Sequence, residues 1–236
     1  MPETWNTIYC GAAPLPDEIW ARWNFDPVLV AALLVLAVLL RRSPSGLLGV
    51  AVLVAAFVSP LCALSSALFA ARTVHHVLII ALAAPLLALA VPARRPGPAM
   101  PAFLVSTAVL WLWHWPAAYD AALSFVPLYW VMQLSLLGAF FWFWRAVLHP
   151  AGPLMPSVLT ILAGWMQMAL LGALLTFAPA PLYEAHLVAP MEWGLTALSD
   201  QQLGGLIMWV PAGLPFLIWA ALSMRGLWRR MAGAPA

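Results

Sequence analysis

Seven apolar stretches separated by short polar connections constrain the fold of this chain more than any other feature. Each is close to the ~20 residues that a helix needs to cross the apolar core of a bilayer. Hydrophobic residues make up 65% of the chain and charged residues 8%, which excludes an ordinary soluble domain. We therefore predict an all-α, polytopic membrane protein, a seven-transmembrane-helix bundle with spans at 26–41, 46–64, 74–92, 100–115, 127–144, 155–178 and 200–223.

Threading these stretches alternately through a membrane sorts the charged residues onto its two sides. One side receives most of the arginines, which are Arg41, Arg42, Arg94, Arg95, Arg145, Arg225, Arg229 and Arg230. The opposite side receives all the acids, which are Glu3, Asp17, Glu18, Asp26, Asp120, Glu184, Glu192 and Asp200. Because short cytoplasmic loops are enriched in basic residues, this pattern predicts the N-terminus outside and the C-terminus inside. The expected parts are an outer segment at 1–25, a membrane domain at 26–224 and an inner tail at 225–236.

Most of the histidines lie with the acids on the outer side. His75 and His76 follow Arg72 at the predicted outer start of the third span. Adjacent residues of a helix point about 100° apart, so one imidazole can face the bundle while the other faces its rim. Imidazoles near membrane depth are costly, which favours a function over an interfacial polar cluster.

The fourth span reaches the outer surface in an aromatic segment that contains His114, Tyr119 and Asp120. The aromatic residues alone are typical of a membrane-interface belt. A carboxylate that orients an imidazole commonly supports a metal-bound histidine. We therefore expect Asp120 and Tyr119 to support His114 if these residues meet.

The seventh span opens with Asp200 and Gln201, and Asp200, Gly204 and Met208 recur every four residues along one helix face. Asp200 is either the N-cap of this helix or a carboxylate beside a cation. Gly204 allows a neighbouring helix to approach closely. A thioether beside imidazoles suits copper, especially Cu(I), although methionine in a membrane helix more often serves packing.

The outer connection at 179–199 is long and apolar enough to cap the bundle, and its His186 is a further candidate ligand. We interpret Met166 and Met168 as core residues and His149 as an interfacial residue on the inner side. Cys10 and Cys62 both map to the outer side, so a disulfide is conceivable, but two unpaired cysteines are the favoured interpretation.

Together these candidates predict a transition-metal site at the outer rim, with His76, His114, His75, Asp200, Met208 and His186 as ligands and Asp120, Arg72, Tyr119 and Gln201 around them. The chain has no GxSxG, HExxH, P-loop or CxxC motif, so we expect no enzymatic turnover. The arginines anchor loops rather than form a patch, and binding of nucleic acid is not expected.

Three segments, HHVLIIALAAPLLALA, WLWHWPAAYDAAL and LSDQQLGGLIMW, resemble the CtaG-type cytochrome c oxidase assembly family of bacterial inner-membrane proteins. The resemblance runs from about residue 27 to 224, and the last segment is the most diagnostic. It implies a multi-pass inner-membrane protein that helps to build a haem–copper oxidase. It also implies a role in the delivery or insertion of copper at the periplasmic face. The implied partners are cytochrome c oxidase subunits, periplasmic copper chaperones and the lipid bilayer.

The family pattern has two histidines four residues apart before the third span. In this chain Arg72 stands at the first of these positions, and His75 replaces a residue that is often Gln. His76 is therefore the residue that the resemblance carries over.

Two other classes of protein fit part of the pattern. A membrane cytochrome b uses histidines from facing helices as axial haem ligands, and His76 and His114 could take that role. A metal transporter places polar groups near the middle of the bilayer, whereas the polar groups of this chain gather at the outer end.

Overall fold

A computed structural model describes residues 9–91 and 93–231, with side chains described up to residue 225. Glu3 and the side chains of Arg229 and Arg230, whose sides of the membrane were predicted, lie outside this part of the chain. The described residues form helices and contain no strand. The longer helices are α1 (Pro27–Leu39), α2 (Pro44–Phe57), α3 (Pro60–Ala67), α4 (Phe69–Val77), α5 (Ala84–Ala90), α6 (Ala99–Leu112), α7 (Pro116–Ser124), α8 (Val126–Val147), α9 (Leu154–Thr176), α10 (Ala197–Trp209) and α11 (Gly213–Met231). The shorter ones are η2 (Ile19–Ala21), η3 (Leu78–Ala83), η4 (Glu184–His186) and η5 (Ala189–Trp193).

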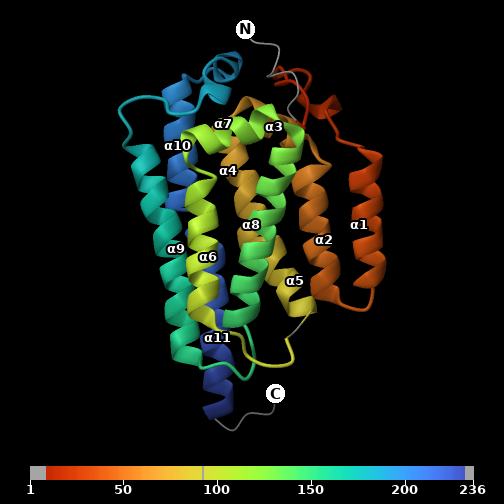
Figure 1. The fold of residues 1–236 in the computed structure, drawn as a ribbon, viewed down its shortest axis with the longest axis vertical. Coiled ribbons are helices and arrows are strands. Elements are labelled where there is room, and N and C mark those ends of the chain that lie inside the picture. The colour runs from red at the N-terminus through yellow and green to blue at the C-terminus, as the bar shows by residue number, and fades with distance from the viewer. Residues whose placement is uncertain (1–8, 92, 232–236) are drawn as a thin grey trace.

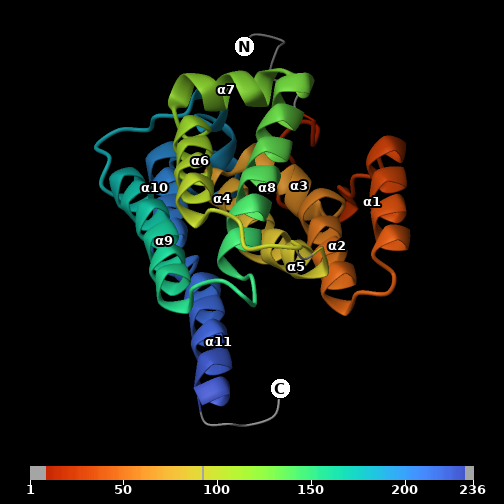
Figure 2. The ribbon, with the colours of Figure 1, turned by 60° about the horizontal axis from the view of Figure 1, so that its bottom comes forward.

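The helices run up and down in one bundle, so the connections gather at its two ends (Figure 1). The connections around residues 40–43, 93–98 and 148–153 lie at one end, which we call the arginine end. The helix α7 and the connection at 177–196 lie at the other end, which we call the histidine end. Figure 2 shows α7 lying across this end rather than along the bundle, and α1 standing at the outer edge beside α2. The predicted sorting of the loops is therefore present in the fold.

Four helical segments of the described chain are long and apolar enough to cross a membrane: Phe69–Ala90, Val126–Val147, Leu154–Thr176 and Ala197–Arg225. The pair α2 and α3, bent by 47° at their junction, forms a fifth if it is counted as one span. The helices α1 and α6 are apolar but shorter. The protein thus has the helices of a multi-pass membrane protein, and length and composition identify four or five of the seven predicted spans.

Proline and short polar side chains set several helix starts. The Asp26 carboxylate accepts hydrogen bonds from the backbone N–H groups of Val28 and Leu29, and Pro27 occupies the first turn of α1. Ser43 and Ser59 precede proline and cap α2 and α3 in the same way. These caps satisfy N–H groups that have no partner within their helix, and proline has no N–H to satisfy there.

The third predicted span differs from its sequence prediction at its outer end. We expected it to begin at residue 74, but α4 begins at Phe69 and continues through η3 and α5 to Ala90. Residues 78–83 adopt the wider π-helical form. Two indole N–H groups donate to carbonyls of this segment: Trp144 to Ile80 at 2.7 Å and Trp219 to Ala81 at 3.4 Å. Neighbouring helices thus supply donors where the regular helical bonding changes.

The helix α10 packs along α9 and α4, which brings the seventh predicted span against the third. A Cβ atom added at Gly205 would lie 2.6 Å from the Gly172 carbonyl oxygen and 2.6 Å from the Thr176 nitrogen. No side chain fits at that distance, so glycine is what lets the two backbones touch.

Cys10 and Cys62 form a disulfide with their Cα atoms 5.3 Å apart. The favoured interpretation of two unpaired cysteines was therefore wrong. The bend between α2 and α3 places Cys62 in a fully buried position, where Asn24 of the N-terminal segment also reaches it. The disulfide ties the segment before α1 to the histidine end of the bundle.

Candidate functional site

Arg72 lies on α4 with only 1% of its surface exposed. Its Nε donates to the Ser65 carbonyl oxygen at 3.1 Å, and its Nη1 donates to the Tyr129 hydroxyl at 3.4 Å. The guanidinium also lies over the Tyr129 ring, 5.3 Å from its centroid, while Nη2 has no hydrogen-bond partner. Neutral oxygens and a ring face thus surround this buried cation among the described residues, so its charge is only weakly compensated.

His75 and His76 lie one turn further along α4, inside the helix rather than at its start. His75 is fully buried with its ring edge-on to Phe57 at 4.8 Å, and neither ring nitrogen has a hydrogen-bond partner. His76 Nε2 lies 3.4 Å from the Gln133 side-chain nitrogen, and its Nδ1 has no partner. Buried imidazole nitrogens are normally hydrogen-bonded, so these atoms are exceptions with unused capacity to bind a proton donor or a metal ion.

His114 lies in the turn between α6 and α7 and faces this pair. Its ring centroid is 6.2 Å from that of His76, and the His75 and His76 centroids are 5.7 Å apart. His114 Nδ1 donates to the Leu110 carbonyl oxygen at 2.7 Å. A carbonyl only accepts, so Nδ1 carries the proton and Nε2 keeps a lone pair that is suited to a metal. We call these three imidazoles the histidine row.

Asp120 does not fix the tautomer of His114, because the Leu110 carbonyl does so. Its carboxylate accepts hydrogen bonds instead from the backbone N–H groups of Glu184 and Ala185, each at 3.2 Å. Burial raises the pKa of Asp120, and these two N–H groups oppose that rise. Asp120 thus holds the start of η4 onto α7 and shapes the connection at 177–196, which we call the outer loop.

His186 is buried beneath that loop, and both of its nitrogens are engaged. Tyr119 Oη lies 2.7 Å from Nε2, and the Ala67 carbonyl oxygen lies 3.2 Å from Nδ1. With a carbonyl as the only acceptor on one side, Nδ1 donates to Ala67 and Nε2 accepts from the Tyr119 hydroxyl. Burial lowers the pKa of His186 to about 3, so the ring stays neutral. His186 and Tyr119 join α7, the outer loop and α3 rather than the histidine row.

Asp200 is fully buried, and its carboxylate accepts from the backbone N–H groups of Phe69 at 2.6 Å and Ala70 at 3.1 Å. It caps α4, whereas its own helix is capped by Thr196 in a capping box with Ser199. Both sequence interpretations, a cap of the seventh span and a charge beside a cation, missed this partner. The contact also explains the early start of α4, because a carboxylate satisfies the N–H groups at a helix N-terminus.

The other candidates of α10 also have neighbours outside the histidine row. The Gln201 side-chain oxygen accepts from the Leu182 N–H at 2.6 Å and so fastens the outer loop. Gly204 packs against Phe69 and Thr73 of α4. Met208 is 2% exposed, and its Cβ lies beside Gly172 of α9.

Within the described residues, no group of three or more His, Cys, Asp or Glu side chains is arranged to hold a metal ion. The structure brings His75, His76 and His114 together with Arg72, and it distributes Asp120, His186 and Asp200 to helix starts and loop contacts. Two residues that lie beside the histidine row and Arg72 were not predicted from the sequence. These are Gln133, which contacts His76, and Tyr129, which contacts Arg72. Gln133 had a usable signal, because an amide within an apolar span is costly unless it has a partner.

The fold and these residues define a helical, multi-pass membrane protein with a buried row of imidazoles beside an arginine. A family model described as cytochrome c oxidase caa3 assembly factor matches residues 38–230. The chain belongs to this family, and the family resemblance seen in the sequence is confirmed. No curated protein and no solved structure matches the chain.

Proposed function

We propose that this assembly factor handles copper for a haem–copper oxidase, and that the histidine row holds the ion during its transfer. The observation that carries the proposal is the free nitrogens of the row. His75 and His76 have buried ring nitrogens without partners, and His114 offers Nε2. Neutral imidazole is a good ligand for copper. The role is one of delivery or insertion and involves no catalytic turnover.

Arg72 bears on the oxidation state of the ion. A buried guanidinium beside the imidazoles disfavours a second positive charge, and a dication more than a monocation. Cu(I) with few ligands therefore suits the row better than Cu(II). His76 and His114 are the proposed first ligands, His75 and Met208 are candidates to complete the site, and Asp200, Asp120 and His186 keep the surrounding backbone in place.

The proposed orientation places the histidine end in the periplasm of a bacterial inner membrane and the arginine end in the cytoplasm. Arginine-rich short loops support it. The disulfide between Cys10 and Cys62 gives independent support, because disulfides form and persist in oxidising compartments such as the periplasm. In this topology all seven predicted segments cross the membrane, with α1 and α6 as short spans. The row then faces the side from which a periplasmic copper chaperone would deliver the ion to the oxidase subunits.

The test is copper retention by the purified protein. The protein is loaded anaerobically with Cu(I), separated from free metal, and analysed for copper per chain. We expect His76→Ala and His114→Ala to lose copper while the protein elutes as the wild type does. His149→Ala is the matched control, since His149 lies at the arginine end, where Nε2 contacts the Ala93 carbonyl oxygen at 3.1 Å.

Full copper retention by both row variants would overturn the proposal. The visible spectrum of the same preparation tests the haem alternative, because axial ligation of haem by His76 and His114 would produce a strong Soret band. Such a band, lost in both variants, would reassign the row to haem.

A further inference from the structure

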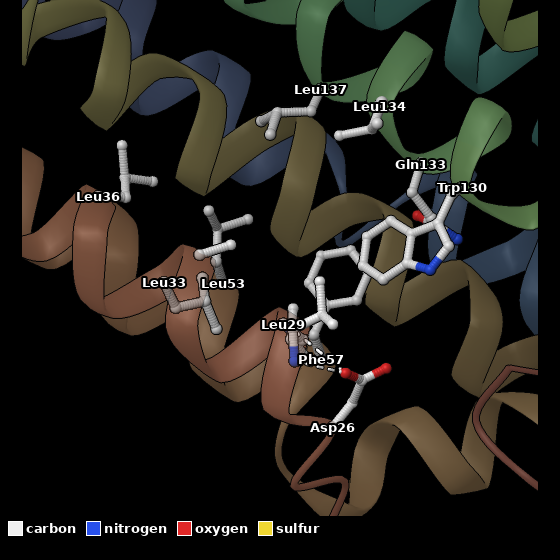
Figure 3. A pocket seen from close by; sticks show the side chains of 12 residues that line it. Asp26, Leu29, Leu33, Leu36, Leu53, Phe57, Trp130, Gln133, Leu134 and Leu137 are labelled. Carbon is white, nitrogen blue, oxygen red and sulfur yellow. Dashed lines mark hydrogen bonds between the residues drawn. The ribbon is translucent and has the colours of Figure 1, made fainter.

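A lateral groove opens between α1, α2 and α8, and two residues of its lining, Phe57 and Gln133, lie against His75 and His76 of the histidine row. It has a volume of about 420 Å³ and runs along α1 from Asp26 past Leu29 and Leu33 to Leu36 (Figure 3). Its opposite wall comes from α8 and includes Trp130 and Leu134. The helix α1 packs chiefly against α2 and stands at the edge of the bundle (Figure 2).

Apart from the Gln133 amide the groove is apolar, and it carries a charge only at one end. Asp26 is the only charged residue of its lining, and it lies at the N-terminus of α1 (Figure 3). Its Oδ1 accepts from the N–H groups of Val28 and Leu29, and its Oδ2 accepts from the Tyr9 hydroxyl at 2.9 Å. The Tyr9 hydrogen bond lowers the pKa of Asp26, so the carboxylate is negative at neutral pH.

We propose that this groove is a lipid site that holds an acyl chain along α1, with the ammonium of a zwitterionic headgroup beside Asp26. The volume lies low in the range of about 300–1,000 Å³ for small-molecule sites, which suits a slender chain better than a helix about 10–12 Å across. The distance along α1 from Asp26 to Leu36 is about 15 Å at 1.5 Å per residue, a stretch that places the charge at one end of the tail.

The headgroup decides which lipid binds. An acyl chain that enters the groove exchanges its contacts with other lipid tails for contacts with the protein. Burial of its apolar surface therefore contributes little to the free energy of binding. The carboxylate attracts an ammonium and repels a headgroup that carries only negative charge. We therefore expect phosphatidylethanolamine to bind in preference to phosphatidylglycerol.

The experiment reconstitutes the full chain into vesicles of phosphatidylethanolamine and phosphatidylglycerol in equal amounts and then measures retained lipid by native mass spectrometry. The wild type should retain one lipid, with phosphatidylethanolamine enriched roughly two- to fivefold, as expected for an exposed charge pair. Ala32 lines the groove, whereas its neighbour Ala31 is exposed on α1 outside the lining. Ala32→Phe should lose the lipid, and the matched control Ala31→Phe should keep it.

Asp26→Asn removes the negative charge but keeps a cap at the start of α1, because asparagine is also a good N-cap. This variant should still retain a lipid but lose the preference for phosphatidylethanolamine. A wild type that retains no lipid, an equal loss in the two alanine variants, or enrichment of phosphatidylglycerol would overturn the proposal. A lipid-free wild-type dimer that Ala32→Phe converts to a monomer would instead assign the groove to a second copy of the chain.

Discussion

Asp200→Asn is the substitution that best separates a structural role from a metal-binding role on α10. The Asp200 carboxylate accepts the N–H groups of Phe69 and Ala70 in a fully buried position. The amide of asparagine has one oxygen, so one of these N–H groups would face an NH₂ donor. The substitution keeps the size of the side chain and therefore tests hydrogen bonding and charge rather than packing.

The expected cost is the loss of one hydrogen bond to a charged acceptor, about 1.5–3 kcal/mol. In chains of 150–250 residues about 1 kcal/mol shifts the Tm by about 2–4 °C, which gives a fall of roughly 3–12 °C for Asp200→Asn. The assay is thermal unfolding of the purified protein in detergent, read together with protein abundance and copper retention. Thr196→Ala is the control on the same helix, because it removes an exposed cap and should cost only about 1 kcal/mol.

An unchanged Tm for Asp200→Asn would refute the capping argument. If copper retention or oxidase assembly were then lost at normal abundance, the negative charge would be needed beside a cation, as the sequence first suggested. If the Tm and abundance fall together and the remaining folded protein keeps its copper, Asp200 acts through the backbone of α4.

Three further predictions concern the ends of the bundle. Reporter fusions should show a periplasmic signal near Val188 and a cytoplasmic signal at Ala236, and the reverse pattern would overturn the proposed orientation. Cys62→Ser should make Cys10 reactive to a maleimide without prior reduction and cost about 2–4 kcal/mol of stability; labelling of the unreduced wild type would contradict the disulfide. Because the pKa of His186 is about 3 in the folded chain and 6.5 is its ordinary value, the unfolded chain takes up the proton first, so stability should fall as pH drops from 6.5 toward 3. His186→Gln should flatten that part of the Tm profile, and an unchanged slope would contradict the burial argument.

The sequence predicts the helices well because apolar runs and proline act locally. Proline in the first turn marks the starts of α1 and α2, and the arginines mark the connections of one end. The number of spans does not follow from the sequence in the same way, because an apolar run does not reveal where its helix ends. The run from residue 100 to 115 contains the end of α6 at Leu112 and the turn that holds His114.

The candidate site was predictable in its residue types and only partly in its contacts. His76 and His114 were both singled out, and their ring centroids lie 6.2 Å apart. The partners of Asp120 and Asp200 were not predictable, because backbone N–H groups are the same in every sequence and leave no residue signature. A carboxylate that binds a helix start therefore looks, in sequence, like one that binds a metal.

The cap that Asp200 gives to α4 links the order of synthesis to the stability of the membrane domain. Asp200 is 131 residues further along the chain than Phe69, whose N–H it accepts. During translation the first turn of α4 therefore emerges long before its acceptor does, and the Asp200 carboxylate reaches these N–H groups only when α10 arrives. A chain that stops before residue 200 lacks this acceptor permanently, so the start of the helix that carries two imidazoles of the histidine row is capped only in a chain translated past Asp200.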